Sequence, residues 1–219
     1  MISVEYLIEE HQRRRKQHLR TLSRVLDFEE IKKQIQTEIE TETLRAKYEG
    51  MGQRELIDSY LTLHDSRERF VGIFEALCDA PPEIFWPVFM HWWPMCDGTR
   101  QNRQHVVRLL KRHHELQRAR PFMSAEDGQF FDSLSYPLTV HRGCGKSYVR
   151  SVTWTTDRDR AEFFARGGRF PTPRNPVVAT AIIDESAVFF ATNCRNEAEV
   201  VLDPYKIRNL SLAPPATLM

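Results

Sequence analysis

The sequence predicts an α+β fold in which an N-terminal helical half packs on a C-terminal half of short strands. Apolar residues recur every three or four positions through about residue 118, which is the period of one face of a helix. From about residue 121 the chain shows short β-rich runs separated by prolines, which is typical of sheets packed face to face. Because no Gly-rich or Ser-rich linker separates the halves, we expect a helical region at 1–120 to pack on a second region at 121–219.

The helical half contains two breaks at which one helix ends before the next begins. Asp79-Ala80-Pro81-Pro82 interrupts the apolar period, and Asp97-Gly98 interrupts it again. The dense aromatic segment between these breaks is expected to form the core that joins the helical half to the sheet. The helices that the period predicts cover residues 25–39, 56–63, 70–77, 85–93 and 106–116.

The second half is predicted to begin with a short helix and to continue as strands with one further helix. Ser124-Ala125-Glu126-Asp127 has the pattern of a capping box, which marks the start of a helix. Thr156 to Asp159 repeats this pattern and opens a helix through Phe163 and Phe164. The predicted strands cover residues 138–141, 151–155, 177–183, 188–192, 198–202 and 207–212.

Composition is that of an ordinary globular protein and excludes several other classes. The 219 residues are 41% hydrophobic, and a formal net charge of +1 gives no global attraction to nucleic acid or membrane. No apolar run approaches the roughly 20 residues of a membrane span, and the N-terminus lacks the pattern of a secretory signal. The 4 cysteines have no C-x-x-C spacing, which argues against zinc and a disulfide framework, so we expect a cytoplasmic protein.

The run Glu197-Ala198-Glu199-Val200-Val201-Leu202 indicates a chemical role. It places two carboxylates two residues apart at the start of a predicted strand, where side chains at i and i+2 point to the same face. Two such charges raise each other's proton affinity, and pairs of this kind are typical of functional sites. A Glu-x-Glu at a strand end is also common as a solvated edge, so the hypothesis needs support from other segments.

Two other segments supply that support through their order along the chain. Val140-His141-Arg142-Gly143 comes first, Val152-Thr153-Trp154-Thr155-Thr156 follows, and Glu197-Ala198-Glu199 comes last. Together they resemble the Arg, Ser/Thr and Glu-x-Glu signature of the mono-ADP-ribosyltransferases, in the clade related to arginine-modifying toxins. The resemblance covers about residues 137–204. It implies a split β-sandwich with NAD bound in the cleft as co-substrate.

The resemblance implies catalytic roles for the two acids. Glu199 would contact the ribose 2′-hydroxyl and stabilise the oxocarbenium-like centre that forms when the nicotinamide–ribose bond breaks. Glu197 would orient or deprotonate the incoming nucleophile. In the family, a Glu at this earlier position accompanies arginine as acceptor. The implied activity is metal-free transfer of ADP-ribose from NAD to a macromolecular acceptor.

The resemblance also implies a set of NAD-binding residues. Arg142 would contact the pyrophosphate, because a guanidinium group matches paired phosphate oxygens. Gly143 would let the backbone approach the nicotinamide amide. Thr153 replaces the family's more usual serine and would hold the catalytic glutamate in place, with Thr155 supporting it. Phe170, in the loop after the second-half helix, would stack on the nicotinamide ring.

The acceptor and the role of the helical half are left open by the sequence. The segment from Asn193 to Asn196, which recognises the acceptor in the family, is short, so protein arginine, a nucleic-acid base and water all stay candidates. The basic residues between Arg100 and Arg120 are either a solvated helix face or a patch for a nucleic acid or acidic partner. Analogy with toxins is consistent with a neutralising protein partner.

Two other functional interpretations were weighed against the enzyme. Gly143-Cys144-Gly145-Lys146-Ser147 looks like the end of a P-loop, but Val140 stands where that motif requires a glycine. The second is a non-catalytic module of the same fold that presents its helical half to a protein or nucleic-acid partner. A rise in melting temperature on addition of NAD would favour the enzyme over that module.

Overall fold

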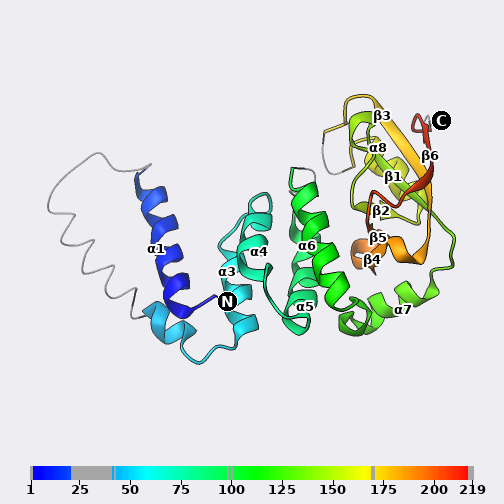
Figure 1. Ribbon diagram of the computed structural model, residues 1–219. Helices are drawn as coiled ribbons and strands as arrows, with labels where there is room; N and C mark the ends of the chain where they lie inside the picture. The colour runs from blue at the N-terminus through cyan, green and yellow to red at the C-terminus, as the bar shows by residue number, and fades with distance from the viewer. Residues whose placement is uncertain are drawn as a thin grey trace. The chain divides into compact units, whose positions relative to one another are not determined.

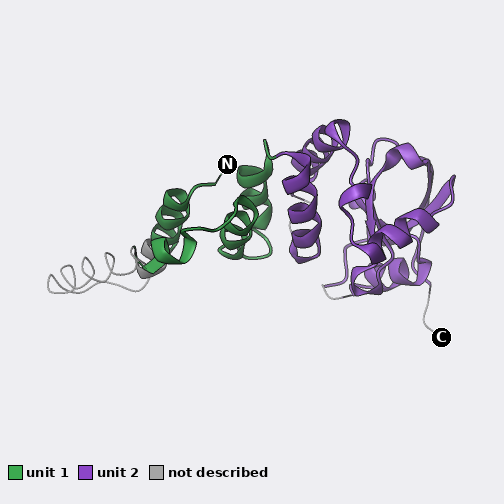
Figure 2. Ribbon diagram, turned by 90° about the horizontal axis from the view of Figure 1, so that it is seen from below, with its two compact units in different colours: residues 1–80 green, residues 81–219 purple. Residues whose placement is uncertain are grey.

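The computed structural model describes residues 2–20, 41, 43–97, 99, 101–168 and 171–216 (Figure 1). The chain forms two compact units, Met1–Ala80 and Pro81–Met219, which Figure 2 shows in separate colours. The first unit is helical in its described part, and the second combines helices with an antiparallel sheet. The predicted α+β class is therefore confirmed. None of the helices in the described ranges is long and apolar enough to cross a membrane.

The first unit contains helices α1 (Val4–Arg20), α3 (Gln53–Thr62) and α4 (Arg69–Leu77). The helices predicted at 56–63 and 70–77 are confirmed as α3 and α4, while the helix predicted at 25–39 lies outside the described residues. Each of the two confirmed helices buries the apolar face that its period indicates. The buried residues are Leu56, Ile57, Tyr60 and Leu61 on α3, and Phe70, Gly72, Ile73, Ala76 and Leu77 on α4.

The second unit is built on an antiparallel sheet of six strands. They hydrogen-bond in the order β4-β5-β2-β1-β3-β6, and every strand predicted from the sequence is present with ends shifted by a few residues. The strands are β1 (Leu138–Gly145), β2 (Thr153–Thr155), β3 (Pro176–Ile183), β4 (Val188–Thr192), β5 (Glu199–Leu202) and β6 (Arg208–Ala213).

A single residue pair, His141 with Thr155, joins β1 to β2 in the middle of this sheet. By contrast, β1 pairs with β3 along its whole length, from Leu138–Ile183 to Gly145–Pro176. The sequence predicts sheets packed face to face. In the structure the His141–Thr155 pair instead joins all six strands into one hydrogen-bonded sheet. The sequence could not show this, because pairing between distant strands leaves no local periodicity.

The two faces of the sheet are buried in different ways. One face carries the main core, in which Val140, Trp154 and Val200 are at most 2% exposed. On the other face helix α8 (Arg158–Ala165) lies against β1, and a Cβ at Gly143 would come within 1.8 Å of the Ala161 carbonyl oxygen. Glycine at this position therefore permits the close approach of helix to strand.

Capping side chains set the starts of both second-half helices. The Ser124 hydroxyl accepts a hydrogen bond from the Asp127 N–H at 3.1 Å and begins α7 (Ala125–Ser133), as predicted. The prediction for α8 was wrong by one residue, since its N-cap is Asp157 and not Thr156. The Asp157 carboxylate accepts from the N–H groups of Asp159 and Arg160 at 2.8 and 3.2 Å and so makes the cap. The Thr156 N–H bonds the Ala198 carbonyl at 3.1 Å beside the sheet.

The aromatic helix α5 (Pro82–Trp92) packs on the sheet through ring contacts. The ring centroids of Trp86 and Phe89 lie 6.4 and 6.1 Å from that of Phe190 on β4. The 3₁₀ turn η1 (Trp93–Met95) continues the helix directly. Contacts thus group α5 with the sheet, and the compact second unit begins at Pro81 rather than at the change from helices to strands near residue 120.

Several basic residues of α6 (Arg103–Leu116) and of the segment after it form hydrogen bonds or ion pairs within the second unit. The Lys111 ammonium lies 2.8 Å from the buried Asp203 carboxylate. Arg103 donates to the Arg150 carbonyl at 2.7 Å. Two exposed pairs lie beyond the helix, Arg118 with Glu185 at 3.1 Å and Arg120 with Asp132 at 2.6 Å. These contacts favour a structural role for the basic stretch, of which Arg100 lies outside the described residues.

Gly143→Ala is expected to lower the free energy of unfolding by about 1–3 kcal/mol, because the new methyl group would overlap the backbone of α8. Urea unfolding measures the change. Thr139→Ala, at an exposed position of the same strand, is the control and should have a smaller effect. A Gly143→Ala protein as stable as the wild type would contradict the close approach of α8 to β1.

Candidate active site

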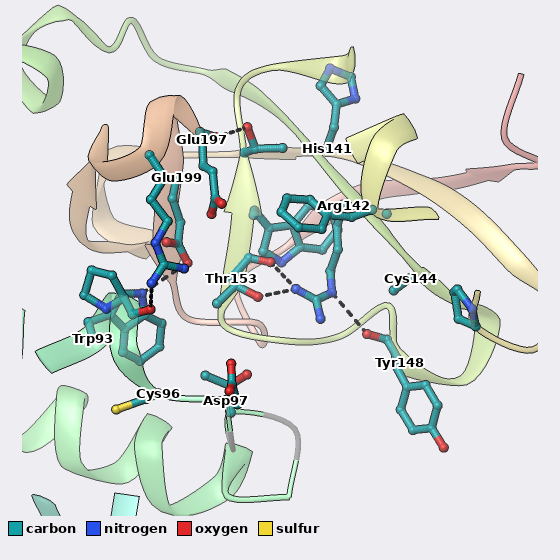
Figure 3. A pocket seen from close by; sticks show the side chains of 18 of the residues that line it. Trp93, Cys96, Asp97, His141, Arg142, Cys144, Tyr148, Thr153, Glu197 and Glu199 are labelled. Carbon is teal, nitrogen blue, oxygen red and sulfur yellow. Dashed lines mark hydrogen bonds between the residues drawn. The ribbon is translucent and has the colours of Figure 1, made fainter. Parts of the chain in front are cut away.

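A pocket of about 470 Å³ lies beside the β1–β2 junction, within the second unit (Figure 3). Its wall is formed by β1, β2, the start of β5 and residues from the 93–101 segment that follows α5. The predicted site residues that the structure describes all line this pocket: Arg142, Gly143, Thr153, Thr155, Glu197 and Glu199. Phe170 lies outside the described residues.

Arg142 supplies a fixed positive charge on the pocket wall. Its Nη1 donates to the Thr153 carbonyl at 2.5 Å and to the Thr153 hydroxyl, and its Nε donates to the Tyr148 carbonyl at 3.3 Å. Removal from bulk water lowers the pKa of Arg142, while Cys144 and Glu199 nearby oppose that shift. An arginine side chain keeps its proton under such conditions, so the guanidinium group stays cationic.

Glu199 faces the same pocket and has an unusually high proton affinity. Burial raises the pKa of Glu199 from 4.5 to about 7, and the neighbouring charge of Glu197 adds to the rise. The Trp93 indole N–H, which donates to Glu199 Oε1 at 3.1 Å, opposes the shift, as do Arg142 and Arg195. A carboxyl group with a pKa near neutrality in a pocket is typical of functional sites.

The two glutamates reach the pocket by a different route from the one predicted. Strand β5 begins at Glu199, and Glu197 lies in the turn that follows the 3₁₀ segment η5 (Cys194–Asn196). Between them Ala198 has a φ of 44°, in the left-handed region. The strand alternation invoked for the pair is therefore wrong at Glu197, and the turn conformation brings its side chain to the pocket.

The threonine hydroxyls also have partners other than those expected. The Thr153 hydroxyl was expected to hold Glu199, but it accepts from Arg142, and Thr153 pairs with Val201 across the sheet. Thr155 pairs with Glu199, and its hydroxyl donates to the Glu197 carbonyl at 2.7 Å. The hydroxyls thus fix the cation and the turn. The expected supporting role of Thr155 beside Glu199 is consistent with its pairing opposite Glu199 and its bond to the Glu197 carbonyl.

Gly143 was expected to make room for the ligand, and the structure gives another reason for it. Although its backbone lines the pocket, the direction of a Cβ at this position leads to Ala161 and Ala165 of α8. Glycine is therefore needed for helix packing. Sequence reasoning missed this because it could not place α8 against β1.

Sequence reasoning also missed Trp93, which was assigned to the aromatic core. The residue is 3% exposed and does pack in that core, but its indole N–H points to the Glu199 carboxylate. Figure 3 shows Trp93 below Glu199, with Asp97 and Cys96 on the same wall. A signal was present, since a buried tryptophan needs a partner for its N–H and so often contacts a polar group.

The pocket therefore combines the Arg142 and Arg195 guanidinium groups with the carboxylates of Glu197, in the turn, and Glu199, at the start of β5. Such a set can bind an anionic group at one end and stabilise a developing positive charge at the other. No family model, no curated protein and no solved structure matches this chain.

Replacing Glu199 with glutamine is expected to stabilise the protein above neutral pH. The raised pKa means that the carboxyl group ionises near pH 4.5 in the unfolded chain but only near pH 7 in the folded protein. The folded state therefore holds more protons in this window, and its stability falls as the pH rises from 4.5 to 7. Glutamine does not titrate, so the advantage of Glu199→Gln should grow by about 2–3 kcal/mol between about pH 4 and pH 8.

Urea unfolding of both proteins across this pH range tests the expectation. Glu115→Gln, which removes an exposed glutamate of the same unit, is the matched control and should show no such growth. A stability difference between Glu199→Gln and wild type that stays constant with pH would show that the pKa of Glu199 is not raised in the folded protein.

Proposed function

We propose that this protein is a mono-ADP-ribosyltransferase that cleaves NAD and transfers ADP-ribose to a macromolecular acceptor. One observation carries the proposal: the three segments that resemble the family signature converge on one pocket, where Arg142 and Glu199 are close enough for each charge to shift the pKa of the other. A pocket of about 470 Å³ is also in the size range of small-molecule sites.

The proposed reaction assigns NAD binding to the cationic side of the pocket. The Arg142 guanidinium, held by Thr153 and Tyr148, would contact the pyrophosphate. The nicotinamide ribose would then lie toward Glu199. Phe170 stays the predicted stacking partner of the nicotinamide ring.

The proposed bond cleavage is assisted by charge. As the C–N bond between ribose and nicotinamide breaks, the bonding pair leaves with nicotinamide and positive charge develops on the ribose. The Glu199 carboxylate would stabilise that charge in its ionised form. Glu197 would accept the proton of the acceptor nucleophile as the new bond to the ribose carbon forms. With water as acceptor the same steps give NAD hydrolysis.

The shape of the sheet supports the finer fold assignment that goes with this activity. The β1–β2 junction of one residue pair separates the series β4-β5-β2 from the series β1-β3-β6. A sheet nearly divided at this point agrees with the split β-sandwich that the resemblance implies. The pocket lies beside the division, where the family would bind the dinucleotide.

Protein arginine is the acceptor favoured by the proposal, because Glu197 and Glu199 both line the pocket and would attract a cationic side chain. A nucleic-acid base is disfavoured by the intramolecular contacts of Lys111, Arg118 and Arg120. The same contacts offer no support for a non-catalytic module that binds nucleic acid through the basic stretch.

Incubation with NAD is expected to release nicotinamide, and Glu199→Gln should reduce the rate by at least about a hundredfold. The rate constant kcat/KM should rise with pH through about 7, because the free enzyme must have Glu199 ionised. Chromatography of released nicotinamide measures both. Glu197→Gln should lower the rate of ADP-ribose transfer to acceptors in a lysate by a larger factor than it lowers the rate of NAD hydrolysis.

Glu115→Gln serves as the control for loss of a single carboxylate outside the pocket and should retain full activity. The acceptor is identified by treating a lysate with biotinylated NAD and separating protein from nucleic acid. The proposal fails if wild type and Glu199→Gln release nicotinamide at the same background rate. A thermal shift with a protein or nucleic acid but none with NAD would favour the binding module.

A further inference from the structure

We propose that Trp93 is the positioning residue for Glu199, holding the catalytic carboxylate through its indole N–H in place of the hydroxyl that the sequence suggested. This inference rests on the proposed function for its catalytic consequence, but the contact itself does not. Trp93 belongs to the turn after α5, far from the signature segments in the sequence.

The two threonine hydroxyls hydrogen-bond to partners other than Glu199. Thr153 accepts from Arg142, and Thr155 donates to the Glu197 carbonyl while accepting from the Asp157 N–H at 3.0 Å. Among the residues that the structure describes, the Trp93 indole is the hydrogen-bond donor to the Glu199 carboxylate, at 3.1 Å. Removing it would leave this carboxylate without a hydrogen-bond donor from the part of the chain that the structure describes.

The indole ring is held rigidly, as a positioning group requires. Trp93 is 3% exposed, and its ring centroid lies 5.4 Å from that of Phe89 and 5.7 Å from that of Phe190. Phe89 is on α5 and Phe190 is on β4, the strand that pairs with β5. The ring is thus fixed both to its own helix and to the sheet that carries Glu199. A donor locked by packing in this way orients its acceptor with little freedom.

The same turn also contacts the loop that precedes Glu199. The Arg195 guanidinium donates to the Pro94 carbonyl, next to Trp93. Arg195, Asn196 and Ala198 all have φ values in the left-handed region, from 44° to 63°, which non-glycine residues rarely adopt. Contacts from outside the loop are needed to maintain such a conformation. The turn at Trp93 and Pro94 therefore braces both the carboxylate and the backbone that leads to it.

Trp93→Phe tests the inference, because it keeps a buried ring and removes the N–H donor. The side-chain carboxyl carbon of Glu199 is titrated by NMR in the full chain, and nicotinamide release is measured against pH. Trp93→Phe is expected to move the Glu199 titration to higher pH, move the rise in kcat/KM by the same amount, and lower kcat by about tenfold or more.

Trp86→Phe is the matched control, since Trp86 is a fully buried residue of α5 whose indole donates to the Gln117 carbonyl at 2.8 Å. It should leave the Glu199 titration unchanged. If Trp93→Phe does not fold, benzothienylalanine at position 93 removes the N–H while keeping the shape of the indole.

The inference is overturned if loss of the Trp93 N–H leaves the Glu199 titration where it is, or if Trp86→Phe moves it equally. A double variant, Trp93→Phe with Glu199→Gln, adds a further check. In the Glu199→Gln background, replacing Trp93 with phenylalanine should change the free energy of unfolding by the same amount at every pH. Should the wild type release no nicotinamide, the proposed function fails, and the NMR titration still decides the Trp93 contact on its own.

Discussion

The single pairing of His141 with Thr155 is the constraint on which the site depends. Through it the register of three strands is linked, because His141 pairs with Thr155 and Thr155 pairs with Glu199. This row places Glu199 on the face that α8 covers. A slip of one residue at the junction would turn Glu199 toward the apolar core, where Trp154 and Val200 now lie.

The junction also explains how Arg142 and Glu199 share a pocket. Side chains alternate along β1, so Arg142 and His141 lie on opposite faces of the sheet. Arg142 is on the face that carries the main core. Since β1 and β2 are paired at one position only, the guanidinium group reaches past Thr153, at the start of β2, and bonds its carbonyl and hydroxyl. A continuous ladder at this point would have kept cation and carboxylate apart.

Burial of these charges opposes folding and is offset locally. The surroundings raise the pKa of Glu199 and lower that of Arg142, which in both cases disfavours the charged form. Hydrogen bonds from Trp93 to Glu199 and from Arg142 to Thr153 and Tyr148 recover part of the lost hydration. The rest of the penalty is a net cost to the stability of the folded protein.

Local features of the chain were sufficient to predict most of the described elements, although α1 (Val4–Arg20) was not among the predicted helices. Apolar periods located α3 to α6, alternating β-rich runs located the six strands, and the Ser124 cap began α7 as expected. These predictions succeed because propensity, periodicity and capping act over a few residues. The order of the three signature segments also indicated part of the pocket lining, namely Arg142, Gly143, Thr153, Thr155, Glu197 and Glu199, while Phe170 lies outside the described residues.

Contacts between distant residues required the tertiary structure. The sequence by itself determined most of the described helices and strands, and which side chains carry the charges of the site. Only the fold decided that Gly143 serves α8, that the Thr153 hydroxyl bonds Arg142, and that Trp93 bonds Glu199. The physical reason is that each of these contacts joins different elements, up to 106 residues apart for Trp93 and Glu199, and so depends on strand register and helix packing, which no local pattern records.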